Sequence, residues 1–374
     1  PVDLMKPEKS QLHGMFYQEW EIDGKLRRML TYIPEGFCHN NRCIIAAGPE
    51  DMKPEEVLDK YYLGDLADRD KVLVCILEPL DGKWDHDGAD ADFMDQAYKR
   101  VQNRQFFVVM QDCIYAMGFG GGAVIAHQAV QRMASEWSGL ASFGDIEDSI
   151  FNKKYRPEIM DQGTQTEELF ISGKKAQVPV WMLVDREDDT AEKLLDYWRH
   201  ENNSQEGYLT FKDNTRVYLP QNVKNTWKVN DDNIAQTRIT TGFELDTLDM
   251  ELISEVWDYI GAARRHRGYN GKVLRYFRDP MKHGATYHTM EVDGMMREWY
   301  EYVPERFKDT EKKLPLVVVL HGRGGNGETF FDITDMSLVA EERGFIAVFP
   351  TADIYQIREG GFRGVRLWNG NYMG

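Results

Sequence analysis

Residues 316–349 read LVVVLHGRGGNGETFFDITDMSLVAEERGFIAVF, and this stretch decides the fold class. The apolar run Leu316–Leu320 has the length of a buried strand and ends at a glycine-rich turn. A helix-forming stretch follows, and residues 345–349 form a second short apolar run. A strand, a helix and a strand at this spacing predict parallel strands joined by a crossover helix, which is the pattern of an α/β protein.

The same arrangement occurs earlier in the chain. CIIAA at residues 43–47 and LVCIL at residues 73–77 are short apolar strands, and the helical stretch LADRD lies between them. Further strands are expected at residues 114–118 and 178–185, and helices at residues 123–133, 190–201 and 250–265. This succession predicts a doubly wound, mostly parallel sheet.

Each of these regions is preceded by a predicted hairpin that turns at Asp-Gly, at residues 15–34 and again at 287–304. The two hairpin regions share nine identities at a constant spacing of 270 residues, which indicates an internal duplication. The identities are Tyr17, Glu21, Asp23, Gly24, Arg27, Tyr32, Pro34, Glu35 and Phe37, which recur as Tyr287, Glu291, Asp293, Gly294, Arg297, Tyr302, Pro304, Glu305 and Phe307.

The duplication predicts two modules of unequal length. We expect a complete module at residues 1–268, a basic, glycine-bearing linker at residues 269–286, and the N-terminal third of a second module at residues 287–374. Such an opening third would leave strand edges and apolar faces bare. We therefore expect another polypeptide, a companion C-terminal chain, to complete the second module.

The composition narrows the class of partner and the location. A net charge of −17 argues against nucleic acid and anionic membranes as partners, because both would be repelled. No apolar run is long enough to span a bilayer, and residues 1–10 lack a signal pattern, so a cytoplasmic protein is expected unless a leader was removed. The four cysteines are expected to be free thiols, with a Cys38–Cys43 disulfide as the alternative, and no metal or cofactor is expected.

The loop HGRGGN at residues 321–326 is the sharpest chemical motif. A histidine and several glycines at the end of a predicted strand let backbone N–H groups turn toward a pocket and bind a developing oxyanion. The alternative is a glycine turn with no catalytic role.

In this loop, in residues 338–352 and in the later LWN, the second copy resembles the poly(3-hydroxybutyrate) depolymerase and feruloyl esterase branch of the α/β-hydrolase superfamily. IYAMGFGGGAVIAH and VPVWMLVDREDD of the first copy support the resemblance. It implies that His321, Gly322, Arg323 and Gly324 form the oxyanion loop, with the N–H of Arg323 as a donor. It also implies that Trp368 lies at the substrate cleft.

The first copy departs from the family pattern at the catalytic positions. Gly120 stands at the centre of the GxSxG-like turn, where the family has its serine, and Ala47 is aligned with His321. Asp188 fits the position of the acid, but residues 239–252 contain no histidine. His127 is expected to be packed in the fold or exposed, and His200 follows the acid at an unsuitable place. The first copy is thus predicted to lack a working triad, and Gly120 and Asp188 are its vestigial positions.

No GxSxG sequence occurs in the 374 residues. The sequence therefore predicts a serine carboxylesterase whose Ser-His-Asp triad lies in the companion chain, acting on a small-molecule or polymer-borne ester of feruloyl, acetyl or polyester type. Two alternatives stay open. One is a non-catalytic binding or scaffold protein, and the other is a metal enzyme that uses the acidic run Asp85, His86, Asp87, Asp90 and Asp92.

Overall fold

The fold was analysed in a computed structural model of the chain. The structure describes residues 13–35, 41–101, 109–152, 176–212, 214–221, 230–266, 273–308, 313–322, 325–357, 363–366 and 368. The helices in these ranges are all too short or too polar to cross a lipid bilayer.

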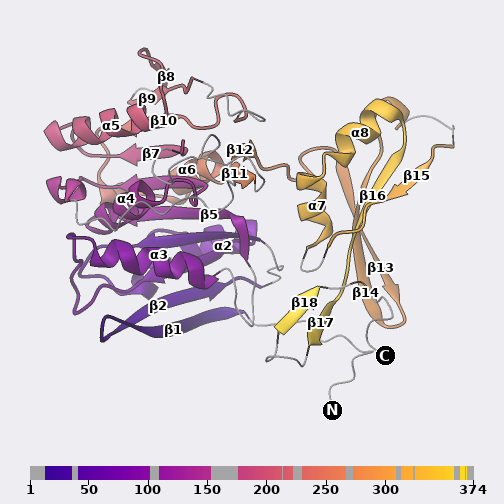
Figure 1. The fold of residues 1–374 in the computed structure, drawn as a ribbon, viewed down its shortest axis with the longest axis horizontal. Helices are drawn as coiled ribbons and strands as arrows, with labels where there is room; N and C mark the ends of the chain where they lie inside the picture. Colours follow the sequence, from indigo (N-terminus) through magenta and orange to yellow (C-terminus); the bar gives the residue numbers. More distant parts are fainter. Residues whose placement is uncertain are drawn as a thin grey trace, which may run out of the picture.

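The larger part of the chain forms a ten-stranded sheet with the order β1-β2-β4-β3-β5-β6-β7-β10-β9-β8 (Figure 1). Strands β4, β3, β5, β6, β7 and β10 are parallel, and antiparallel strands flank them on both sides. The strands are β1 (Gly14–Ile22), β2 (Lys25–Ile33), β3 (Asn41–Ala47), β4 (Leu73–Leu77), β5 (Val109–Phe119), β6 (Gly139–Phe143), β7 (Val180–Leu183), β8 (Leu209–Phe211), β9 (Thr215–Tyr218) and β10 (Thr237–Thr240).

Helices cover both faces of this sheet. One face packs against α3 (Ala89–Val101), α4 (Gly122–Arg132) and α5 (Asp189–Glu201). The other packs against α1 (Pro54–Lys60), α2 (Leu63–Asp70) and α6 (Met250–Ile260). The prediction of a doubly wound, mostly parallel α/β sheet is therefore confirmed, because the central strands are apolar on both faces and need helices on each side. We call this sheet with its helices the first unit.

A second, four-stranded sheet has the order β13-β14-β16-β15. Its strands are β13 (Ala285–Val292), β14 (Met295–Tyr302), β15 (Leu316–Val318) and β16 (Ile346–Thr351), and α7 (Gly327–Ile333) and α8 (Met336–Arg343) pack on one of its faces. We call these elements, with the loop around His321 and Trp368, the second unit. Two small ribbons complete the assignment, β11 (Ala263–His266) with β12 (Val273–Tyr276), and β17 (Ile354–Ile357) with β18 (Arg363–Arg366).

The two units repeat the same strand order. The order β1-β2-β4-β3 matches β13-β14-β16-β15, and each pair has the same direction. Both hairpins turn through an Asp-Gly pair with positive φ at both residues, 49° and 74° at Asp23-Gly24 and 52° and 74° at Asp293-Gly294. This is the turn that suits the twist of two adjacent strands, so the predicted hairpins are confirmed.

The register identifies the equivalent positions of the two sheets. Tyr32 pairs with Val74, which in turn pairs with Ile44, and the repeat residue Tyr302 pairs with Ala347, which pairs with Val317. Positions in the strands after the hairpin are therefore 273 residues apart, rather than 270. Helices α1 and α7, and likewise α2 and α8, begin and end at positions with this same spacing.

Residues near the predicted boundary lie between the sheets. The segment expected as a linker, residues 269–286, contains β12, which pairs with β11. A buried ion pair joins Arg264 of β11 to Asp332 of α7, and the backbone N–H of Arg278 donates to the same carboxylate at 2.9 Å. Burial raises the pKa of Asp332 to about 6. The division into modules at residues 268 and 287 stays a prediction.

The described cysteines Cys43, Cys75 and Cys113 are buried thiols outside any disulfide, as the sequence predicted for Cys75 and Cys113. Cys38 lies outside the described residues.

Candidate functional site

His321 follows the second unit's strand β15 after two further residues and is almost fully buried. Its Nε2 accepts a hydrogen bond from the backbone N–H of Ala352 at 2.9 Å, and its Nδ1 lies 2.7 Å from the carbonyl oxygen of Gly322. A carbonyl only accepts, so Nδ1 carries the proton and the imidazole is neutral. His321 therefore links the end of β16 to the first peptide of the glycine loop.

Trp368 closes this arrangement from the other side. Its indole N–H donates to the carbonyl oxygen of His321 at 2.7 Å, and the centres of the two rings are 4.7 Å apart. Gly325 packs against His321, because a Cβ added to Gly325 would stand only 3.1 Å from the Cβ of His321. Asn326 then caps α7 by accepting a hydrogen bond from the N–H of Thr329. The structure thus brings the predicted residues His321, Gly322 and Trp368 together, whereas Arg323 and Gly324 lie outside the described residues.

The first unit has a tryptophan in the same role. The indole N–H of Trp84 donates to the carbonyl oxygen of Gly48 at 2.8 Å, and Gly48 is the register equivalent of His321. The alignment of Ala47 with His321 was therefore wrong by one residue. A Cβ at Gly48 would lie 2.3 Å from a methyl group of Val57, so an imidazole has no space there.

The turn predicted to be a nucleophile elbow lies between β5 and α4. Gly120 has a φ of +54°, its N–H donates to the carbonyl of Phe143 at 2.8 Å, and its own carbonyl accepts from Ala123. A Cβ at Gly118 or Gly122 would lie within 2.4 Å of neighbouring backbone, so the strand and the helix approach too closely for any side chain at these two positions. The shape of the elbow is present, but the residue at its centre has no hydroxyl.

Apolar groups surround this centre. A Cβ on Gly120 would stand 3.5 Å from Pro49 and 3.6 Å from Leu245, which belongs to the segment where the family pattern has its histidine. The carboxylate of Asp188 accepts hydrogen bonds from the N–H groups of Thr190 and Ala191 and caps α5. Asp188 is thus occupied at a helix terminus, and Gly120 faces no imidazole among these contacts.

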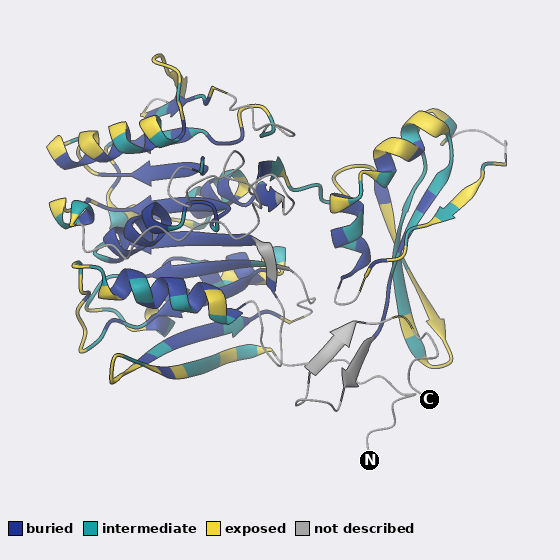
Figure 2. Ribbon diagram, viewed as in Figure 1, coloured by how far each residue is buried: buried dark blue, intermediate teal, exposed yellow. Residues whose placement is uncertain are grey.

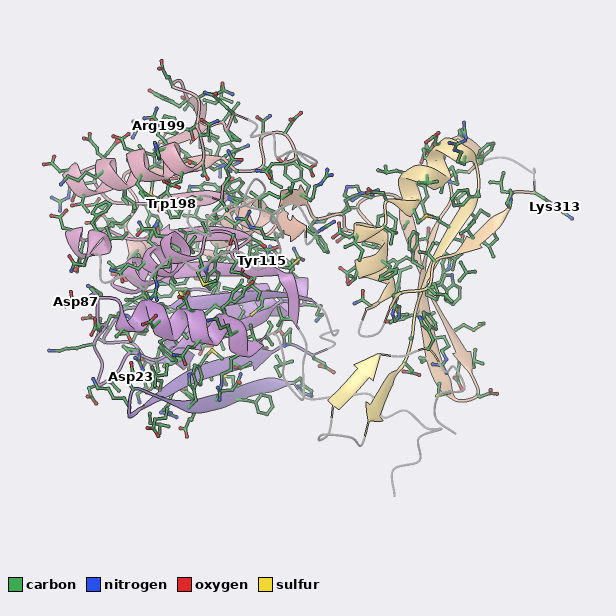
Figure 3. The ribbon with its side chains drawn as sticks, viewed as in Figure 1. Asp23, Asp87, Tyr115, Trp198, Arg199 and Lys313 are labelled. Carbon is green, nitrogen blue, oxygen red and sulfur yellow. The ribbon has the colours of Figure 1, made fainter. Side chains whose placement is uncertain are left out.

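Two other histidines of the first unit, His127 and His200, have partners other than Gly120 and Asp188. His127 is fully buried on α4, where its Nδ1 accepts from the indole of Trp198, labelled in Figure 3, and its Nε2 lies 2.9 Å from the hydroxyl of Ser142. Burial lowers its pKa to about 3, so it is neutral. His200 is exposed and contacts Glu201. The expectation that His127 is packed rather than catalytic agrees with this placement.

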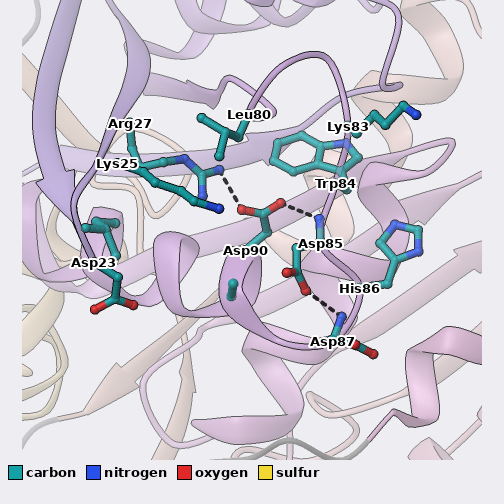
Figure 4. Close-up of a pocket in the computed structure, with 12 residues that line it drawn as sticks. Asp23, Lys25, Arg27, Leu80, Lys83, Trp84, Asp85, His86, Asp87 and Asp90 are labelled. Carbon is teal, nitrogen blue, oxygen red and sulfur yellow. Dashed lines mark hydrogen bonds and ion pairs between the residues drawn. The ribbon is translucent and has the colours of Figure 1, made fainter.

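A cavity of about 460 Å³ opens beside the acidic run of the first unit (Figure 4). Its centre is the buried ion pair between Arg27 and Asp90, 2.5 Å apart, and Asp90 also accepts from the backbone N–H of Asp85. Asp92 is paired with Arg132 instead. Within the described ranges no group of three potential ligands is placed to hold a metal, and two carboxylates of this run are paired with arginines instead.

The second unit has a cavity of about 420 Å³ beside Trp368. Arg297, the repeat of Arg27, lines it and pairs with Asp353 at 2.5 Å. The sequence identified the repeated arginines and Trp368, but not Trp84 or the two aspartates as partners. Asp90 lies in α3 and Asp353 just after β16, so the two aspartates do not share the spacing of the repeat and the sequence did not align them.

Comparison with known proteins gives structural likeness only. No protein-family model and no curated protein matches the chain. Acetyl xylan esterase from Aspergillus awamori is similar with a TM-score of 0.49 and 9% identity, over 66% of this chain and 99% of that one. S-formylglutathione hydrolase FrmB from Staphylococcus aureus gives a TM-score of 0.36 and 9% identity, over 50% and 86%. LpqC, a poly(3-hydroxybutyrate) depolymerase from Bordetella parapertussis, gives a TM-score of 0.34 and 13% identity, over 49% of this chain and 72% of that one.

Proposed function

We propose that the chain is part of a carboxylic ester hydrolase of the serine type and that its catalytic centre forms at the second unit. The observation that carries the proposal is the neutral imidazole of His321, which holds the first peptide of a glycine loop at the carboxyl end of a parallel strand. Active sites of open α/β sheets form at this end. The resemblance of HGRGGN and the later LWN to the poly(3-hydroxybutyrate) depolymerase and feruloyl esterase group supports the same assignment.

The role of the loop follows from peptide geometry. In a trans peptide the C=O and the next N–H point in opposite directions. Holding the Gly322 carbonyl toward the imidazole would therefore direct the N–H of residue 323 away from His321, where it can serve as an oxyanion donor. His321 has both ring nitrogens bonded to backbone, so we assign it to positioning and not to proton transfer.

The catalytic serine, acid and histidine would come from a companion polypeptide that completes the second unit, as the tandem arrangement implies. The serine gives its proton to the triad histidine as it attacks the ester carbonyl, the oxyanion rests on backbone N–H groups, and the alcohol leaves with that proton. Water then attacks the acyl-enzyme and releases the acid and the serine. The proposed substrates are esters of aromatic or hydroxy acids or acetyl esters, either small or carried on a polymer.

Two measurements test the proposal. The intact mass of the protein purified from its source should show a companion beside this 43.4 kDa chain, and a fluorophosphonate probe should label the companion alone. In the unlabelled complex, Arg323→Pro should slow hydrolysis about a hundredfold, whereas Arg323→Ala keeps the backbone donor and most of the rate. Arg343→Ala, an exposed change on α8, is the control. Equal rates for the proline and alanine variants would exclude this loop as the oxyanion site.

A second candidate function is non-catalytic binding by a pseudo-hydrolase. The first unit favours it, because Gly120 lacks a hydroxyl, Asp188 caps a helix and Leu245 occupies the neighbouring space. A complex that contains both polypeptides but is not labelled by the fluorophosphonate would support this candidate.

A further inference from the structure

One face of the second sheet is apolar and open. Met290, Leu316, Val318 and Leu320 are each more than half exposed, and Trp299 and Val348 between them are partly exposed. Figure 2 shows the contrast in burial, since β15 is largely exposed whereas the central strands of the first sheet are dark blue and buried. The equivalent residues of the first sheet are buried, and they are Trp20, Cys43, Ile45, Ala47, Met29 and Cys75. Exposed apolar patches of this kind mark interaction sites.

The first unit shows what covers this face. Helices α3 and α4 pack on the equivalent side of β3, and their apolar residues share one buried cluster with Ile45 and Cys75. Strand β5, which connects α3 to α4, pairs with β3 in parallel. In the first unit, helices α3 and α4 therefore cover the face, and β5 between them extends the sheet.

The edge of β15 is open as well. Strand β3 pairs with β4 on one side and β5 on the other, whereas β15 pairs with β16 alone among the described strands. The N–H of Val319 donates to Val348 of β16. Because alternate residues of a strand direct their N–H groups to opposite sides, the N–H of Val318 points to the open edge. Such an edge accepts an added strand.

The cavity of the second unit corresponds to the place of one aromatic side chain. In the first unit, the centre of the Phe93 ring in α3 lies 5.2 Å from that of Trp20. The guanidinium of Arg27 stands over the Phe93 ring, 4.1 Å from its centre. The second-unit equivalents of Trp20 and Arg27 are Met290 and Arg297, and both line the 420 Å³ cavity. No residue of the described chain fills this position.

We infer that this open face is the docking site of a helix–strand–helix segment of the companion polypeptide. The inference rests on the proposed function for the identity of the partner. The segment adds a strand parallel to β15, covers Val318 and Val348 with its helices, and inserts a large apolar or aromatic side chain between Met290 and Arg297. The Arg297–Asp353 pair at the rim presents the guanidinium to that ring, as Arg27 does to Phe93.

The test uses the full chain with its companion polypeptide, in the complex purified from the source, and the companion serves as the probe. Hydrogen exchange of the backbone amides of the full chain is measured with and without the probe. The expected result is at least a tenfold slowing at the amide of Val318, together with protection of Met290 and Trp299.

Two variants make the result decisive. Val318→Lys places a charge on the face and should abolish the protection. Met296→Lys is the matched control, since Met296 is exposed on the opposite face and its equivalent Leu26 is exposed too. An unchanged Val318 amide, or equal protection in both variants, overturns the inference.

Self-association is measured in parallel by light scattering without the probe. A dimer that Val318→Lys converts to a monomer would identify a second copy as the occupant and overturn the inference. The hydrogen-exchange result is independent of the proposed function, because the exchange of backbone amides does not require a catalytic serine. Protection by the probe without fluorophosphonate labelling of the native complex would overturn the function and retain the docking site.

Discussion

The two units share a hairpin, a strand order and a pair of helices, but they differ in opposite ways at two places. At the loop after β3 or β15, the second unit has the imidazole of His321 and the first has Gly48, where Val57 takes the space. On the sheet face beside that loop, the first unit is covered by α3 and α4, and the second is open. The comparison separates packing from the proposed chemistry, since the covered unit has Gly120 at the centre of its elbow and the open unit has the loop that we propose as the oxyanion site.

The largest expected effect concerns the repeated arginine. Arg27→Met leaves the buried carboxylate of Asp90 without its cation, which costs about 4 kcal/mol of unfolding free energy. The equivalent change Arg297→Met should cost less, about 2 kcal/mol, because Arg297 itself is partly exposed although the carboxylate of Asp353 is buried. Urea unfolding, with exchange of β4 and β16 amides as local reporters, measures both. Equal losses would show that the two pairs are equally buried in solution.

A second pair of variants compares equivalent face positions. Ile45→Ala removes buried methyl groups and should cost about 3 kcal/mol. Val318→Ala, at the equivalent exposed position, should cost under about 0.5 kcal/mol. The same unfolding experiment applies, and a large loss for Val318→Ala would mean that the face is already covered in this chain.

The buried histidine of the first unit predicts a pH effect of intermediate size. The folded pKa of His127, about 3, lies below the ordinary value of 6.5, so the unfolded state binds the proton first as the pH falls. The contribution of neutral His127 to the free energy of unfolding is fully present above pH 6.5 and is lost toward pH 3. The loss at pH 5 is about 2 kcal/mol. Unfolding curves at pH 7.5 and 5 should show this loss relative to His127→Gln. An identical pH slope in the two proteins would contradict it.

The smallest effect is expected from Gly120→Ser. The side chain meets only ordinary contacts, but a φ of +54° strains a residue with a Cβ by about 1 kcal/mol. No fluorophosphonate labelling of the first unit should appear, because Leu245 stands where a base would be needed. Thermal unfolding measures the first effect, and labelling of this serine would reveal a base that the contacts do not show.

The sequence predicted the hairpins and the doubly wound sheet, because Asp-Gly turns and short apolar runs act locally. It misplaced the equivalent of His321 by one residue, because aligning Ala47-Gly48 with His321-Gly322 implies a spacing of 274, whereas the strand register gives 273. Trp84 was missed for a similar reason, because the segment between β16 and Trp368 is longer than the segment between β4 and Trp84. The capping role of Asp188 and the crowding at Gly48 depend on tertiary contacts.

The neighbourhood of Leu245 also bears on how the first unit could change over evolutionary time. A serine at position 120 has no use without a base, and a histidine near Leu245 has none without the serine. An imidazole at position 48 would also require a smaller residue at Val57. Each substitution is neutral or harmful until the others are present, so selection for activity could not introduce a serine and a histidine at this turn one step at a time.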